Sequence, residues 1–163
     1  MPGYIIHLAI SKKQIELSNI QNKEEFIRGT IAPDLLKKAG IDSHYGYSSN
    51  PNLKKFLENN SLKSDYNKGY FLHLATDYLF YNKFLEKWSP QIYEDYNVLN
   101  KILVDKYKIQ IPKEVEKDIK FEEKSLTILN LDDIISFIEN VGKIPINQMY
   151  RKYMGEINYE SEK

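Results

Sequence analysis

Helical periodicity of the apolar residues is the feature that most constrains the fold of this chain. The stretch Asp65–Trp88 reads as one long helix, and three further segments place apolar side chains at helical spacing: Tyr4–Leu17, Ile92–Tyr107 and Leu131–Val141. No segment sustains the alternation typical of strands, and the chain has no internal repeat. The pattern therefore predicts an all-α, single-domain bundle of six or seven helices.

Turn and cap residues mark where these helices should begin and end. Asn22 can cap a second helix, which we expect to end at about Thr30 or Ile31 because Pro33 disfavours helical geometry at the residue before it. A long loop rich in Gly, Ser and Asn follows from Lys38 to Pro51. Pro51 suits the first turn of a short helix.

The second half shows fewer functional signals and reads as supporting structure. Ser64 or Asp65 can cap the long helix that starts at Asp65. Gly142 is a candidate stop for the helix predicted over Leu131–Val141. A last helix should run from Pro145 to about Met154. We therefore expect a site-bearing half over residues 1–88, supporting helices over 89–154 and a frayed tail over 155–163.

Composition excludes several classes of protein. The 163 residues carry 23 basic and 23 acidic side chains, so no field of one sign indicates nucleic acid or an anionic membrane as partner. The absence of cysteine rules out disulfides, a thiol nucleophile and thiolate metal ligands. The start of the chain lacks a basic signal-peptide region, and no apolar run approaches the ~20 residues of a membrane span. We expect a cytoplasmic protein, and the sequence gives no indication of its oligomeric state.

The candidate chemistry lies in three histidines and two aspartates of the first half. His73 and Asp77 are four residues apart and so share one helix face, where a metal ion or a proton can lie between them. Gly69, one turn earlier, leaves that face bare and predicts the close approach of another group. His7 lies near the start of the first helix, and the remaining candidates are Asp34 after Pro33 and His44 in the loop.

Imidazole and carboxylate donors of this kind suit zinc and also accept manganese or iron(II). Each part alone is common, because His–Asp pairs at helical spacing and Pro-Asp turns occur in many proteins. A buried core histidine with a surface aspartate is the competing interpretation of His73 and Asp77.

The order of these residues resembles the zinc-dependent phospholipase C family, whose all-α fold is shared with the fungal single-strand-specific nucleases. The resemblance spans roughly residues 3 to 85 and rests on His7, FIRGTIAPD ending in Asp34, His44, and GYFLHLATDYLF with His73 and Asp77. It implies one metal ion held by Asp34, His44, His73 and Asp77. A second ion would be held by His7 and Asp77, with the amino end of the chain as a further ligand.

The same resemblance implies a metal-dependent hydrolase of a small soluble phosphoric ester, with one or two zinc ions and Asp34 as both ligand and proton acceptor. Family members with three ions carry more His and Glu ligands after the helix aspartate. Here Tyr81, Asn82 and Lys83 follow, and no histidine lies beyond His73, so the third position is missing or rebuilt.

Several other residues are weaker candidates. Tyr45 and Tyr47 flank the loop histidine and can contact substrate, although tyrosine is abundant in this chain. Asp95 can accept a hydrogen bond from a ligating imidazole, but a helix-surface aspartate is the more common case. Arg28, Lys37 and Lys38 are the nearest cations to Asp34 and are more often solvated surface charges.

Two alternative functions remain open at this stage. A non-catalytic relative could keep the metal for structure or for interaction with a partner. A His-Asp type nucleotide phosphohydrolase also uses these residues on helices, but it needs a His followed directly by Asp, which this chain lacks.

Overall fold

The computed structural model describes residues 3–161, with side chains described up to Met154. The described residues form seven α-helices, a π-helical turn and a 3-10 helix, and include no strand, which confirms the all-α class. The elements are α1 (Gly3–Leu17), α2 (Lys23–Lys38), α3 (Leu53–Asn59), α4 (Asp65–Leu79), η1 (Phe80–Phe84), α5 (Ile92–Tyr107), η2 (Lys113–Asp118), α6 (Leu131–Gly142) and α7 (Ile146–Ser161). No helix of this described part is long and apolar enough to cross a membrane.

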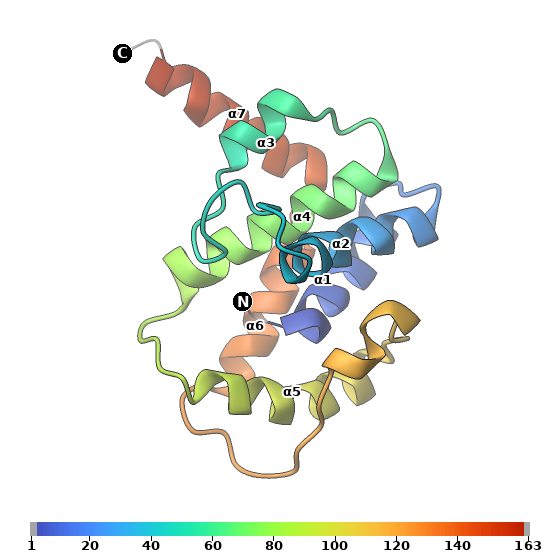
Figure 1. Cartoon of the computed structure of the whole chain (residues 1–163). Helices are drawn as coiled ribbons and strands as arrows, with labels where there is room; N and C mark the ends of the chain where they lie inside the picture. The colour runs from blue at the N-terminus through green and yellow to red at the C-terminus, as the bar shows by residue number, and fades with distance from the viewer. Residues whose placement is uncertain (1–2, 162–163) are drawn as a thin grey trace.

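Helices α1, α2 and α4 form the centre of the bundle (Figure 1). Helix α1 is buried on all sides from Ile5 to Ser11 and packs against α2, α5 and α6. Helix α4 crosses the middle of the molecule, with α3 and α7 on its upper side in Figure 1 and α5 at the bottom of the molecule. The residues of the predicted site therefore lie on the most enclosed elements of the fold.

Helices α2 and α4 run parallel and touch through backbone. A Cβ added to Gly29 would lie 2.0 Å from the carbonyl oxygen of Tyr66, and one added to Gly69 would lie 2.1 Å from that of Phe26. The predicted close approach at Gly69 is thus confirmed, and the approaching group is the α2 backbone. Because neither position has room for a side chain, the two glycines set the distance between the helices that carry Asp34 and His73.

Helix α2 does not end before Pro33, as the sequence predicted, but continues to Lys38 with Pro33 inside it. Proline removes one helical hydrogen bond and usually costs about 3 kcal/mol in a helix interior. Here tertiary contacts hold the turn: Pro33 is buried, and its carbonyl oxygen accepts a 2.5 Å hydrogen bond from the Ser43 hydroxyl. Local propensity was overridden by packing at the position that presents Asp34.

The predicted single helix from Asp65 to Trp88 is shorter in the structure. The α-helix ends at Leu79, a π-helical turn follows to Phe84, and Leu85 is extended. The wider turn places Phe80 and Phe84 with ring centroids 5.5 and 5.0 Å from that of Phe137 on α6. Because these two rings pack against α6, apolar residues continue at helical spacing in the sequence beyond Leu79, where the α-helix ends.

Smaller differences concern caps and ends. Pro51 lies before α3, and Asn52 is the N-cap, accepting from the Lys55 amide. Ser64 caps α4, whereas Asp65 instead accepts from the backbone amides of Gln21 and Asn22. The predicted Asn130 cap of α6 is confirmed.

The structure also differs from the sequence-based prediction at the ends of two helices. Gly142 is the last residue of α6, and Lys143 is its C-cap. Helix α7 runs past Met154 to Ser161, and the expected frayed tail falls partly on residues 162–163, outside the described residues.

Candidate metal centre

Four side chains from three segments converge at the centre of the bundle. Asp34 comes from α2, His44 from the loop between α2 and α3, and His73 with Asp77 from α4. One donor atom from each lies within 4.8 Å of all the others, and the four residues are between 0 and 4 % exposed. Such a group of two carboxylates and two imidazoles can hold a metal ion.

The nitrogen–oxygen spacings of the donor atoms suit a common ion. Asp34 Oδ1 lies 3.3 Å from Nε2 of both His44 and His73. Asp77 Oδ2 lies 3.2 Å from His44 Nε2 and 3.1 Å from His73 Nε2. Zinc–ligand bonds of 2.0–2.1 Å imply tetrahedral edges of about 3.3–3.4 Å. All four atoms are buried and make no hydrogen bond to any described residue, so they are orphaned polar atoms that face one another.

Backbone and hydroxyl contacts fix which nitrogen of each imidazole is free. His73 Nδ1 lies 2.7 Å from the Thr30 carbonyl oxygen, which can only accept, so Nδ1 carries the proton. The Ser43 hydroxyl donates to the Pro33 carbonyl oxygen and so accepts from His44 Nδ1 at 3.1 Å. Both rings therefore direct a free Nε2 at the carboxylates, as ligating histidines do.

The electrostatics of the group call for a cation. Burial alone would raise the pKa of Asp34 and Asp77, but the neighbouring imidazoles, of His73 and His44 and for Asp77 also of His7, together outweigh it and hold both pKa values below the usual range. Burial would lower the pKa of His73, yet the two carboxylates raise it to about 10. Two carboxylates thus stay ionised in the protein interior, and either a proton on each of the His44 and His73 rings or one divalent ion can balance their two negative charges.

His7 lies beside this group and contacts only one of its carboxylates. Its Nε2 lies 2.9 Å from Asp77 Oδ1, and its ring stacks on His73 with centroids 3.7 Å apart. Burial and the neighbouring His73 lower the pKa of His7, which makes the neutral ring with an Nε2 proton the donor to Asp77. The predicted second ion between His7 and Asp77 stays a prediction, and the amino end it would include, residues 1–2, lies outside the described residues.

The weaker candidates have other partners in the structure. The Tyr45 hydroxyl accepts from Asn60, and its ring packs against Phe56, whereas Tyr47 is 82 % exposed. Asp95 is buried, contrary to the expected surface position. It accepts hydrogen bonds from Thr127 and from the backbone amides of Ile128 and Leu129, so it anchors that loop and contacts no described imidazole.

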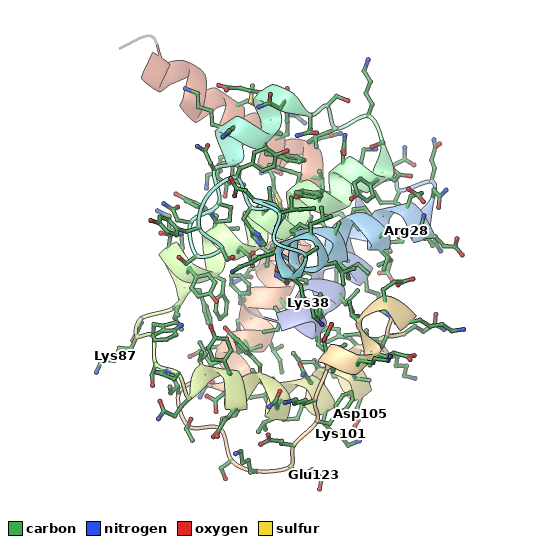
Figure 2. The ribbon with its side chains drawn as sticks, in the orientation of Figure 1. Arg28, Lys38, Lys87, Lys101, Asp105 and Glu123 are labelled. Carbon is green, nitrogen blue, oxygen red and sulfur yellow. The ribbon has the colours of Figure 1, made fainter. Side chains whose placement is uncertain are left out.

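Of the three basic residues near Asp34 in sequence, two pair with a carboxylate and the third contacts a hydroxyl. Arg28 points outward at the edge of the molecule and pairs with Glu25, as expected of a surface charge (Figure 2). Lys38 pairs with Asp118. Lys37 is also exposed but contacts the Ser48 hydroxyl, at 2.5 Å, rather than a carboxylate of the described residues.

The residues after Asp77 have structural partners of their own. Asn82, five residues after Asp77, donates to the backbone carbonyl oxygens of Ser49 and Tyr78. It therefore ties the end of α4 to the loop that carries His44.

Two residues that orient the histidines, Ser43 and Thr30, were not among the residues predicted from the sequence. Ser43 directly precedes His44, which was a usable signal, because a hydroxyl next to a ligand candidate can orient it. Thr30 acts through its backbone carbonyl, and no side-chain pattern could reveal that contact. The Thr30 hydroxyl has a separate role, donating to the Phe26 carbonyl oxygen and accepting from Ser11.

Comparison of the chain with protein-family models, with curated proteins and with solved structures gives no match in any of the three.

Proposed function

We propose that this chain is a metal-dependent phosphoric-ester hydrolase whose ion is held by Asp34, His44, His73 and Asp77. The observation that carries the proposal is the set of four buried, unpartnered donor atoms spaced 3.1–3.3 Å from one another across the nitrogen–oxygen pairs. A structural zinc site usually recruits cysteine, whereas this set is built only of nitrogen and oxygen donors. A divalent ion there would supply an acidified water and a positive charge beside a phosphoryl oxygen.

The protein's own residues would hold, orient and accept protons around that ion. Asp34 Oδ1 belongs to the donor group, and its Oδ2 is buried without a partner among the described residues, so it is available to accept a proton from water. His7 donates to Asp77 Oδ1 and orients that carboxylate. Ser43 and the Thr30 carbonyl keep both ligating rings in the required tautomer.

The choice of a phosphoric ester rests on the resemblance of the ordered set His7, Asp34, His44, His73 and Asp77 to the zinc-dependent phospholipase C family. Zinc is the ion this donor set suits best, and manganese or iron(II) is also compatible. The substrate we propose is small and soluble.

One observation favours a second function, that of a protein that keeps the ion for stability alone. All four ligands are almost fully buried, and four protein ligands can complete a tetrahedral site without an open position. In that case the ion would stabilise the contact between α2, α4 and the His44 loop, and the surface would carry the function.

Metal analysis combined with a hydrolysis assay separates these functions. We expect about one zinc ion per chain after zinc add-back, and hydrolysis of bis(4-nitrophenyl) phosphate that a chelator abolishes and zinc restores. Asp77→Asn should lose both metal and turnover, whereas Asp132→Asn, an acidic residue in the first turn of α6, should lose neither. Bound zinc without turnover on a broad phosphoester panel would support the structural function. A chain that takes up no zinc would contradict both.

A further inference from the structure

A surface cavity of about 700 Å³ is lined in part by residues that follow each of the candidate metal ligands in α2, in the His44 loop and after α4. Lys37 is three residues beyond Asp34 on α2, Tyr47 is three beyond His44 in the loop, and Tyr81 is four beyond Asp77. On α2, three residues correspond to about one helical turn, or ~5.4 Å. The cavity therefore lies beside the C-terminal ends of α2 and α4 and the His44 loop, the segments that carry the candidate metal ligands.

Aromatic side chains form much of its wall. Tyr47, Trp88 and Tyr93 line the cavity and are 82, 56 and 53 % exposed. The rings of Trp88 and Tyr93 meet edge to face, with centroids 6.4 Å apart. Three solvent-exposed rings on one concave surface offer flat apolar faces to a ligand, because aromatic pairs favour stacked or edge-to-face contact.

The cavity has one basic side chain, Lys37, and one acidic side chain, Glu86, among its lining residues. The Lys37 ammonium donates to the Ser48 hydroxyl and has no carboxylate within ion-pair distance in the described part of the chain. An anionic group can therefore replace the hydroxyl as its partner and gain a charge-assisted contact. Glu86, the acidic residue of the wall, is exposed and would repel an anion that approached it.

We propose that this cavity is the substrate pocket, and that it takes a small phosphoric ester whose alcohol part carries a planar ring. The ring lies against Tyr47, Trp88 and Tyr93, and Lys37 contacts the phosphate on the side nearest to Asp34. This inference rests on the proposed function for the fate of the ester, but binding in the cavity can be measured without turnover.

Trp88 is the one tryptophan of the chain, so its fluorescence reports directly on the cavity. Titration of the metal-free and the zinc-loaded protein with phenyl phosphate should change Trp88 emission and reach saturation. Methyl phosphate and phenol, which lack the ring and the phosphate respectively, should need at least about tenfold higher concentration.

Variants assign the contacts. Tyr93→Ala should weaken phenyl phosphate binding about three- to tenfold. Lys37→Met should weaken phenyl phosphate but leave phenol unchanged, and Glu86→Gln should strengthen phenyl phosphate. Tyr150→Ala, a half-exposed tyrosine on α7 outside the cavity, is the matched control and should change nothing.

The outcomes distinguish the two proposals. Saturable binding without turnover would keep the pocket and overturn the hydrolase. Metal-dependent turnover of an aryl phosphodiester with a KM that Tyr93→Ala and Lys37→Met leave unchanged would keep the hydrolase and overturn the pocket. Trp88 emission that does not respond to millimolar phenyl phosphate, or that responds equally to methyl phosphate, would also overturn it.

Discussion

His7 and Asp77 lie 70 residues apart in the chain and are joined by a 2.9 Å contact between Nε2 and Oδ1 in the protein interior. The other oxygen of Asp77 faces the imidazoles of His44 and His73. One carboxylate thus links the first helix of the chain to the candidate metal centre. Because His7 also stacks on His73, it restrains two of the four candidate ligands.

Replacing His7 with alanine should lower zinc affinity about 10–100-fold and leave the stoichiometry at one ion per chain. The reason is that outer hydrogen bonds to metal ligands typically contribute this much to affinity. Competition with a chromophoric chelator measures the change. Ser11→Ala, a buried polar residue of the same helix, is the control. A drop from two ions to one in His7→Ala would instead show that His7 ligates a second ion.

Ser43→Ala should weaken zinc binding by a similar factor, about 10–100-fold, because His44 loses the acceptor that keeps its Nδ1 protonated. Nitrogen NMR of the metal-free protein should show a larger fraction of the tautomer with the proton on Nε2. Ser48→Ala, in the same loop, removes only the contact with Lys37 and should leave His44 unaffected. Equal effects of both variants would contradict the orienting role.

Gly69→Ala should destabilise the fold by at least about 1–3 kcal/mol, because its methyl group would lie 2.1 Å from the Phe26 carbonyl oxygen and must push α2 from α4. Gly142→Ala is the comparison variant and should cost less, since the added methyl would meet side-chain atoms of Lys13, Cδ at 2.7 Å and Cβ at 2.9 Å, rather than a backbone atom. Urea denaturation of both variants measures the difference. If Gly69→Ala were as stable as Gly142→Ala, the close backbone crossing would be wrong.

Asp95→Asn should lower the free energy of unfolding by about 1.5–3 kcal/mol at neutral pH, because an amide cannot replace a carboxylate that accepts from three backbone amides and a hydroxyl. Burial would raise the pKa of Asp95, but the amides of Leu129, Thr127 and Ile128 outweigh it and lower this pKa. The contribution is therefore complete above the unfolded pKa of about 3.9 and is lost as pH falls through the lower folded value.

Urea denaturation from pH 7 to pH 2 checks this dependence, and the gap between wild type and Asp95→Asn should close at the acidic end. Glu94→Gln, its exposed neighbour, should change stability little at any pH. Zinc content should be unchanged in Asp95→Asn, since Asp95 anchors residues 127–129 and not the metal centre.

The sequence by itself determined the helical class, most helix starts and the identity of the chemical groups. Asn22, Ser64 and Asn130 act locally as caps, through a side chain and an amide three residues away, so their pattern is readable without a fold. The His73–Asp77 spacing likewise fixes one face of one helix.

Only the tertiary structure decided how α2 passes through Pro33, where α4 gives way to a π-helical turn, and that Asp95 is buried. Each depends on partners distant in sequence: Ser43 for Pro33, Phe137 for the turn and residues 127–129 for Asp95. The candidate metal centre is of this kind, because Asp34 and His44 reach His73 and Asp77 only when two glycines let α2 and α4 touch. The periodicity of the sequence predicts which face of each helix is apolar, whereas the free energy of packing determines which helices contact each other.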